Sequence, residues 1–157
     1  MREERGWLAT SVAPVPPELG GEMQKSVHIR PACLQDGVEV LSLLEDVGYY
    51  PEPISFAQTF RKTLANPGFL IRVAHAEGRI VGMASLSMRY HLGIGGLLAC
   101  LDEIAIRPGV YAKRAERLLT RATLGRARAL GARHVVNQPN EWTPPPRAAQ
   151  LAASAAC

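Results

Sequence analysis

The pattern that most constrains this chain is a strand–helix–strand unit over residues 97–136. The apolar run Leu97–Ile106 has the composition of a core strand and is ended by a Pro-Gly pair. An amphipathic stretch over 114–130 has most of its arginines on one face, and its predicted inner face consists of Ala115, Leu118, Leu119, Ala122, Ala129 and Leu130. The β-prone segment ARHVV follows it. A helix between two strands carries the chain back to the end of the sheet where the first strand began. The second strand then runs in the same direction as the first, so the two are expected to pair in parallel.

A β-hairpin is predicted just before this unit. The β-rich runs FLIRVAHA and RIVGMASLSMRY flank the dipeptide Glu77-Gly78, which is typical of a tight hairpin turn. The glycine-rich segment GIGG at 93–96 is interpreted as a flexible connection to the next strand. The hairpin and its extension predict three consecutive antiparallel strands.

Two helices are predicted between a first strand at Val27–Arg30 and the hairpin. The first has apolar residues at helical spacing, with Asp36 as the expected N-cap and Gly48 as the expected C-cap. The second is expected to have Ser55 as its cap and to stop at the Asn-Pro-Gly segment 66–68, because Phe56, Phe60 and Leu64 repeat at every fourth residue. The predicted order is β-α-α-β-β-β-α-β. It corresponds to an α/β (α+β) protein with a mixed, mostly antiparallel central sheet flanked by helices.

The chain of 157 residues is long enough for one domain with a substantial core. Residues 1–25 are rich in Pro and Gly and are predicted to be a flexible arm, residues 26–140 the domain, and residues 141–157 a Pro- and Ala-rich tail with a short helix as one reading. No apolar stretch reaches the roughly 18 residues of a membrane span. The N-terminal stretch also lacks a continuous apolar signal core, so we expect a cytoplasmic protein without a membrane partner.

Charge and the metal-binding residue types narrow the ligands. The net charge is +4 and the pI about 9.3. This charge suits an anionic small molecule, whereas the lack of an aromatic-studded basic stripe argues against nucleic acid. The histidines lack metal-ligand spacing, so no metal site is predicted. Reduced thiols are expected for the three cysteines, which are few, odd in number and far apart: Cys33, Cys100 and Cys157.

Several segments, in this order, resemble the GNAT superfamily of Gcn5-related N-acetyltransferases. IRPA followed by an Asp is similar to the family's first strand and helix, and GRIVGMASL to its third strand. LDEIAIRP resembles its acid-rich fourth strand, and ARALGARHVV the end of its third helix and its fifth strand. The resemblance covers about residues 27–137. It implies the acyl-CoA N-acyltransferase fold, with acetyl-CoA as co-substrate.

The resemblance also implies where the site lies. In the family, the fourth strand diverges from the fifth, and the pantetheine arm of acetyl-CoA hydrogen-bonds along the freed edge, which here would be Ile104, Ala105 and Ile106. A carboxylate on the same strand can take the proton of the attacking amine, directly or through water. Asp102 and Glu103 would face opposite sides of a regular strand, so at most one is expected to line the site unless a bulge re-aims both. Glu103 is the favoured base and Asp102 the reserve. Paired acids can also form a solvated edge or partner an arginine.

The family's phosphate loop, Gln/Arg-x-x-Gly-x-Gly/Ala, corresponds here to YAKRAE at 111–116. Ala112, Arg114 and Glu116 stand where glycine is usual, although glycine lets the backbone approach the diphosphate closely. Nearby cations would compensate, and a shift of one residue would put Ala115 at the last small position. The predicted cofactor-binding residues of this segment are Tyr111, Ala112, Lys113, Arg114, Ala115, Glu116 and Arg117.

The C-terminus is the second departure from the family pattern. Family members usually add a helix with a tyrosine and a final pair of strands, whereas here the last residues offer only a weak helix and no tyrosine. The fifth strand would then be an exposed edge. A homodimer, a swapped element or a truncated gene product would each explain this.

The expected function is therefore transfer of an acetyl group from acetyl-CoA to a primary amine of a small molecule or peptide, within a ternary complex. Tyr49 and Tyr50 lie where the family has its acceptor loop, and they are the predicted substrate-binding residues, unless they are ordinary loop aromatics. The alternative is a catalytically weak or inactive GNAT-fold binding module, because the phosphate loop lacks glycine and the C-terminal elements are not evident.

Overall fold

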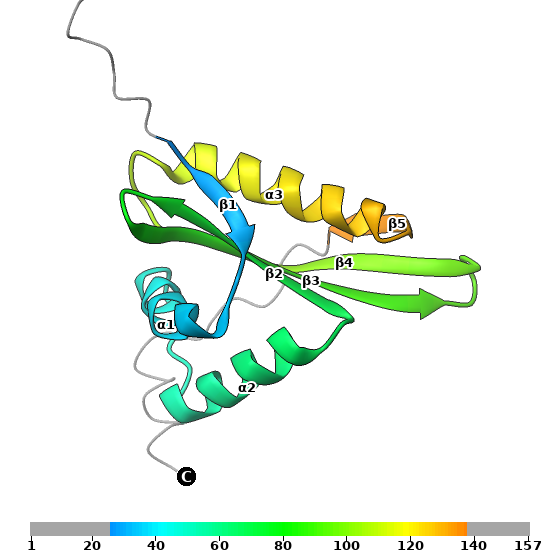
Figure 1. The fold of residues 1–157 in the computed structure, drawn as a ribbon, viewed down its shortest axis with the longest axis horizontal. Coiled ribbons are helices and arrows are strands. Elements are labelled where there is room, and N and C mark those ends of the chain that lie inside the picture. Colours follow the sequence, from blue (N-terminus) through cyan, green and yellow to red (C-terminus); the bar gives the residue numbers. More distant parts are fainter. Residues whose placement is uncertain (1–25, 138–157) are drawn as a thin grey trace, which may run out of the picture.

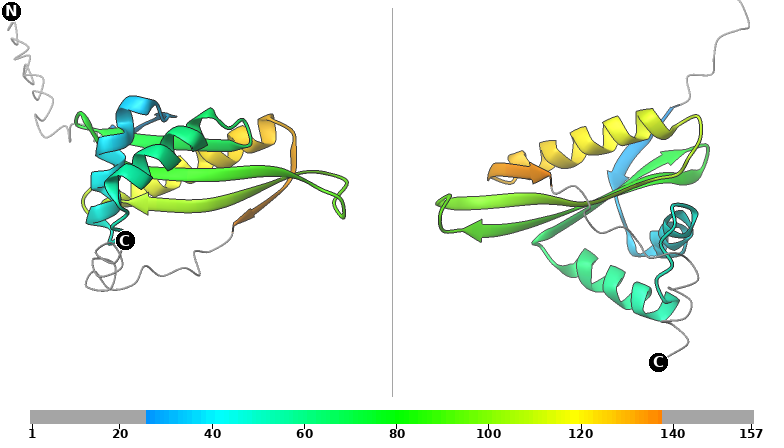
Figure 2. Two further views of the ribbon diagram at one scale, coloured as in Figure 1. Left: turned by 90° about the horizontal axis from the view of Figure 1, so that it is seen from below. Right: turned by 180° about the vertical axis from the view of Figure 1, so that it is seen from behind.

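The computed structural model describes residues 26–137, which form one five-stranded sheet with helices on both faces (Figure 1). The strands lie in sequence order, β1-β2-β3-β4-β5. Helices α1 and α2 cover one face and α3 covers the other (Figures 1 and 2). The elements are β1 (His28–Pro31), a 3-10 turn η1 (Leu34–Asp36), α1 (Gly37–Asp46), α2 (Pro53–Ala65), β2 (Phe69–Ala76), β3 (Arg79–His91), β4 (Gly96–Ile106), α3 (Ala112–Ala129) and β5 (Ala132–Asn137).

The predicted fold class and order of elements are confirmed, with η1 as the one addition. Strands β1 to β4 pair antiparallel, and β5 pairs parallel to β4, as the strand–helix–strand unit predicted. The β2–β3 turn holds Glu77 at φ 50° and Gly78 at φ 74°. Two consecutive left-handed residues are what a two-residue type I′ hairpin turn requires. The expected arm over 1–25 and tail over 141–157 lie outside the described residues, as does Cys157.

The predicted start of the second helix is wrong. Helix α2 begins at Pro53, and the carboxylate of Glu52 accepts hydrogen bonds from the N–H groups of Ile54 (2.9 Å) and Ser55 (2.7 Å). These bonds lower the pKa of Glu52. Proline suits the first helical position because its missing N–H would have no intrahelical partner there. Ser55 is therefore a capped residue rather than the cap.

Asp36 stands at the N-cap of α1, as predicted, but its side chain has another task. Its carboxylate receives both terminal nitrogens of Arg30 at 2.7 Å, together with the backbone N–H of Cys33 at 2.7 Å. Asp36 is 6% exposed, and the hydrogen bonds from Arg30 hold the pKa of this carboxyl well below its usual range. The cluster ties β1 to the entry of α1.

The core has one layer on each face of the sheet. Leu43 of α1, Phe60 of α2 and Ile80 of β3 pack on one face, and Leu119 of α3 packs with Leu101 of β4 on the other. The buried stripe of α3 consists of Ala115, Leu119, Thr123 and Ala127, at a spacing of four residues. The C-terminal part of its predicted inner face is wrong, because Ala129 and Leu130 are exposed where the helix ends.

Strand β5 covers only half of β4. Its register runs from Leu97 opposite Ala132 to Leu101 opposite Asn137. Within residues 26–137, no strand pairs with 102–106 on that side, and Figure 2 shows β5 diverging from β4. Residues 103–106 of β4 are therefore paired with β3 alone.

Candidate active site

A β-bulge in β4 decides where the two predicted acids point. Ser85 of β3 pairs with Glu103, but the next residue, Leu86, pairs with Leu101. Asp102 is therefore the extra residue of the bulge and has no partner across the strand pair. The bulge interrupts the alternation of side chains, and both acids line one pocket on the α1–α2 face. The sequence predicted that both acids could line the site only if a bulge re-aimed them, and this bulge is present.

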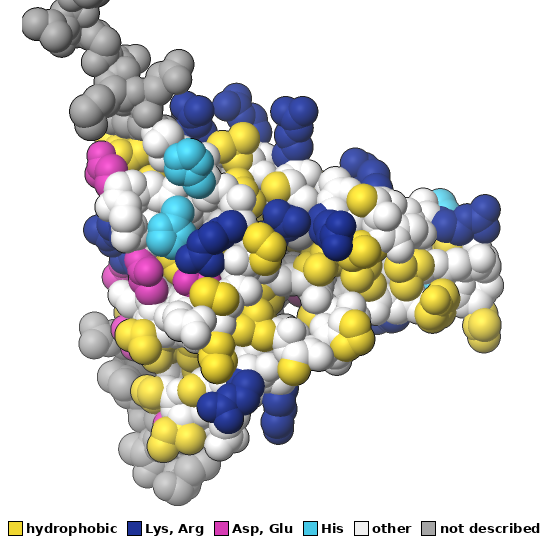
Figure 3. Space-filling view, viewed as in Figure 1, with side chains coloured by type: hydrophobic (Ala, Val, Ile, Leu, Met, Phe, Trp, Pro, Cys, Tyr) yellow, Lys and Arg dark blue, Asp and Glu magenta, His cyan; other side chains and the backbone are white. Residues whose placement is uncertain are grey.

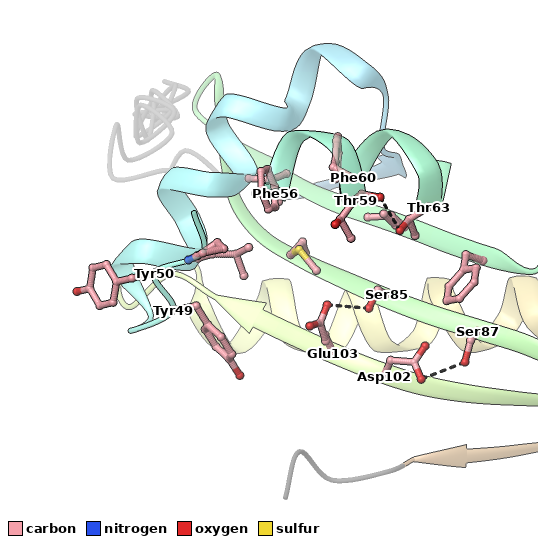
Figure 4. Close-up of a pocket in the computed structure, with 16 residues that line it drawn as sticks. Tyr49, Tyr50, Phe56, Thr59, Phe60, Thr63, Ser85, Ser87, Asp102 and Glu103 are labelled. Carbon is pink, nitrogen blue, oxygen red and sulfur yellow. Dashed lines mark hydrogen bonds between the residues drawn. The ribbon is translucent and has the colours of Figure 1, made fainter. Parts of the chain in front are cut away.

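The two acids are held by neighbouring serines of β3 (Figure 4). The Ser85 hydroxyl donates to Glu103 Oε2 at 3.1 Å, and the Ser87 hydroxyl donates to Asp102 Oδ1 at 3.0 Å. Glu103 is exposed, whereas Asp102 is half-buried. The Oδ2 atom of Asp102 is buried and has no hydrogen-bond partner among the described residues. One carboxylate is thus open to the pocket, while the other has an unused acceptor oxygen.

The pocket has a volume of about 830 Å³ and is mostly apolar. Its walls come from α1, the loop after it, α2 and strands β2 to β4. Figure 4 shows the side chains of α2 facing the acids of β4 across it. The lining residues are Val40, Leu44, Tyr49, Tyr50, Pro51, Phe56, Thr59, Phe60, Thr63, Phe69, Ile71, Met83, Ser85, Ser87, Asp102 and Glu103.

The predicted substrate-binding tyrosines, Tyr49 and Tyr50, are among these lining residues, at the end of the pocket nearest α1. The sequence reading missed the aromatic wall. Phe56 and Phe60 stack with ring centroids 5.6 Å apart. Their spacing of four residues predicted a helix face, but the spacing alone does not distinguish a face packed on the core from one that also borders a pocket.

The serines that hold the acids were also missed. Ser85 and Ser87 alternate along β3, so they share one face of that strand. This alternation within ASLSM was the available signal. Which acid each serine meets depends on the pairing of β3 with β4, and the sequence does not state that register.

The predicted phosphate-binding segment forms the start of α3. Within the described residues, the backbone N–H groups of Lys113 and Arg114 have no hydrogen-bond partner, as expected in a first helical turn. The side chains of Lys113, Arg114, Glu116 and Arg117 are exposed, and Figure 3 shows basic side chains projecting along α3. Ala115 is fully buried in the core, so it does not face a ligand.

Tyr111, the residue before α3, is directed away from the exposed face of this segment. It packs against the core, and a hydrogen bond with the carboxylate of Glu77 raises the pKa of its phenol. The side chain thereby connects the start of α3 to the β2–β3 turn. Ala112, the first residue of the helix, donates its N–H to the carbonyl of Gly109 at 3.2 Å.

The predicted edge for acetyl-CoA lies in the half of β4 that β5 leaves unpaired. Ala105 is buried, and Ile104 and Ile106 are half-buried, because their side chains pack into the core layers above and below the sheet. Only their backbone groups can therefore be offered to a ligand on that side. The following residue, Arg107, forms an ion pair with Asp46 that connects the end of β4 to α1.

Two of the histidines, His91 and His134, are exposed and do not line the pocket. Among residues 26–137, no three His, Cys, Asp or Glu side chains gather as a metal site would require. No helix in this part of the chain is both long and apolar enough to cross a membrane.

Comparison with known proteins supports the fold. No family model and no curated protein matches the sequence. Among solved structures, an acetyltransferase from Trypanosoma brucei is 21% identical with a TM-score of 0.63, over 74% of this chain and 84% of that one. A GNAT family acetyltransferase from Staphylococcus aureus is 13% identical with a TM-score of 0.65, over 76% and 93%.

A third similar structure is a predicted acetyltransferase with acetyl-CoA from Clostridium acetobutylicum. It is 14% identical with a TM-score of 0.60, over 74% of this chain and 82% of that one. Identities this low establish architecture rather than activity. Residues 26–137 thus have the fold of the GNAT acetyltransferases.

Proposed function

We propose that this protein is an N-acetyltransferase that transfers the acetyl group of acetyl-CoA to a primary amine. The observation that carries the proposal is the bulge at Asp102. It brings two carboxylates into one apolar pocket, within the half of β4 that β5 leaves unpaired. An amine entering this pocket meets a proton acceptor, and the adjacent strand edge can take a peptide-like ligand.

The reaction needs one proton acceptor and one thiolate leaving group. The ammonium form of the acceptor loses a proton to Glu103, directly or through water, and Asp102 is the reserve base. The amine lone pair then forms a C–N bond to the thioester carbon, while the C–S bond breaks and its electron pair leaves with sulfur. The second amine proton leaves to solvent as the amide forms, and the thiolate takes up a proton to give coenzyme A.

Two features would hold acetyl-CoA as a substrate. The backbone of Ile104, Ala105 and Ile106 would pair with the amide groups of the pantetheine arm, as a further strand would. The free N–H groups at the start of α3, with the cations Lys113, Arg114 and Arg117, would hold the diphosphate. Three exposed cations near two phosphates outweigh the one nearby acid, so the absence of glycine does not by itself exclude binding.

Calorimetric titration of the full chain with acetyl-CoA tests the proposal. We expect saturable binding, and we expect Lys113→Ala with Arg114→Ala to weaken it roughly tenfold or more. The matched control is Arg126→Ala with Arg128→Ala, which removes two exposed arginines at the other end of α3. Lack of binding at millimolar acetyl-CoA would refute the proposed acetyltransferase activity. An equal effect of both double variants would refute the assigned phosphate site.

Acetyl transfer against pH then tests the base. If Glu103 takes the proton, Glu103→Gln should lower kcat by roughly 10²–10⁴-fold and change the dependence of the rate on pH. An unchanged dependence of the rate on pH would mean that Asp102 or water accepts the proton. The variant Asp102→Asn distinguishes these two, because it lowers the rate only if Asp102 is the base.

The second candidate function is a GNAT-fold binding module without turnover, which the absence of glycine from 111–116 favours. It predicts ligand binding without release of coenzyme A for any amine. A homodimer and a cytoplasmic location also stay predictions, and light scattering of the full chain tests the former.

A further inference from the structure

The charges in the pocket have one sign. Of the sixteen described residues that line it, two are acids, Asp102 and Glu103, and none is Lys, Arg or His. The nearby cation at the end of β4, Arg107, is paired with Asp46 and is not part of the lining. Within residues 26–137, the pocket therefore offers a counter-charge to an ammonium group and none to a carboxylate or a phosphate.

The remaining surface of the pocket suits an apolar body. The rings of Phe56 and Phe60, both on α2, stack with their centroids 5.6 Å apart. Figure 4 shows them across the pocket from the acids of β4. Phe69, Met83 and the two tyrosines extend this apolar surface. The polar groups besides the acids are hydroxyls, of which three already donate: Thr63 to the carbonyl of Thr59, and Ser85 and Ser87 to the acids.

The size of the pocket adds a second constraint. At about 830 Å³ it lies within the range of pockets that enclose drug-sized ligands. A small amine such as ethylamine would leave most of the apolar wall in contact with water. A ligand with an aromatic ring would displace that water and gain the hydrophobic contribution of the buried area.

We propose that the acceptor is a primary amine carried on an apolar body of aromatic size, without a carboxylate or phosphate near the amine. This inference rests on the proposed function, because it names the substrate class of the same pocket. The ammonium end lies by Asp102 and Glu103, and the body lies against Phe56 and Phe60. An anionic substituent beside the amine would be repelled by the two acids in a partly desolvated site.

A matched series of four amines tests the charge and the body separately. 2-Phenylethylamine has both preferred features, L-phenylalanine adds a carboxylate, L-phenylalaninamide adds a neutral group of similar size, and ethylamine lacks the ring. Affinities are measured by titration of the full chain near neutral pH, with and without coenzyme A, and acetyl-transfer rates are measured for the same four.

We expect 2-phenylethylamine and L-phenylalaninamide to bind within about tenfold of each other, and the other two amines to bind roughly tenfold or more weakly than both. L-Phenylalanine binding as tightly as its amide would overturn the exclusion of anions. Ethylamine binding as tightly as 2-phenylethylamine would overturn the apolar body.

Two variants locate the binding. Phe56→Ala should weaken 2-phenylethylamine roughly tenfold or more and leave ethylamine nearly unchanged. The control Ile54→Ala truncates a 68%-exposed residue of the same helix that does not line the pocket. Thr59→Arg places a cation in the lining, where it can attract a carboxylate. The ratio of the affinities for L-phenylalaninamide and L-phenylalanine should therefore decrease. Equal effects of Phe56→Ala and Ile54→Ala would place the ligand elsewhere.

The outcomes separate this inference from the proposed function. If acetyl-CoA does not bind but the amines rank as expected, the pocket binds amines of this class, and the proposed acetyltransferase activity is refuted. If acetyl-CoA binds and acetyl transfer occurs but the four amines do not differ, the substrate class is refuted and the enzyme stands. Because the amine series uses the unmodified chain, it decides the inference even if a variant fails to fold.

Discussion

The two halves of β4 differ in their neighbours and in their side chains. Residues 97–101 lie between β3 and β5, and most of their side chains are buried. Residues 102–106 have only β3 as a neighbouring strand, begin with the bulged Asp102 and carry both acids. The first half connects the sheet, whereas the second exposes a strand edge and two carboxylates. One strand can thus serve both stability and ligand binding, because a bulge and the divergence of β5 separate the tasks along its length.

The largest loss of stability is expected in residues 97–101, the half of β4 that lies between two strands. Leu101 is 2% exposed and packs with Leu119 beneath α3, so Leu101→Ala should leave a cavity and cost about 3 kcal/mol of unfolding free energy. Denaturant titration measures this loss. Ile104→Ala, which truncates a half-buried side chain of the other half, should cost clearly less. Equal losses would remove the energetic difference between the halves.

An acid outside β4 provides a contrast to the two in it. Asp36 accepts charge-assisted hydrogen bonds from Arg30 at a buried position, so Asp36→Asn should cost about 2 kcal/mol near neutral pH. Since the pKa of Asp36 is lowered by folding, its contribution is complete above the unfolded pKa of about 4 and is lost as pH falls toward the folded value. Denaturant titrations across this acid range measure it.

The control for this acid effect is Glu45→Gln, which removes an exposed carboxylate of α1. The difference in stability between the parent chain and Asp36→Asn should shrink as the pH falls below 4. A difference that stays constant would mean that the ionised form of Asp36 contributes nothing.

A smaller loss of stability tests how β3 and α3 support residues 102–106, the half of β4 that β5 does not reach. Gly82 of β3 pairs with Ile106, and an added Cβ would lie 2.8 Å from Ile106 Cδ1 and 2.9 Å from Leu119 Cδ1. Gly82→Ala should therefore cost about 1–2 kcal/mol through overpacking, measured by thermal unfolding. Gly125→Ala is the control, because nothing lies within 4 Å of its added Cβ. If Gly82→Ala is as stable as the control, this end of β4 is free to shift.

The smallest effect on stability is expected at the proposed base. Glu103 is exposed and hydrogen-bonded only to Ser85 among the described residues, so Glu103→Gln should change the unfolding free energy by no more than about 0.5 kcal/mol. Denaturant titration beside the acetyl-transfer assay checks this. A loss of stability as large as that of Asp36→Asn would make Glu103 a structural residue and would undermine its proposed role.

Much of the fold could be predicted because its signals are local. The hairpin at Glu77-Gly78 and the strand–helix–strand unit depend on neighbouring residues, and both are confirmed. The start of α2 was predicted wrongly because Glu52 and Pro53 looked like loop residues, although a proline can open a helix that the preceding carboxylate caps. Such errors arise where one residue type fits two local roles.

The candidate site was predicted only in part. Asp102 and Glu103 stood out as acids in an apolar strand, and Tyr49 and Tyr50 were expected on the acceptor side; all four line the pocket. The wall formed by Phe56 was read as a helix face. A contact between α2 and β4 depends on how layers pack, and no spacing within one segment encodes it.

The order of elements, the antiparallel and parallel connections, and the presence of two acids on one strand follow from the amino-acid sequence. That Asp102 is the bulged residue follows from the folded structure, because a bulge is a property of two paired strands. The folded structure likewise decided that β5 leaves β4 after Leu101 and that α2 closes an apolar pocket over the acids. Local propensities act between residues near in sequence, whereas register and layer packing are settled by side chains that meet only when the chain is folded.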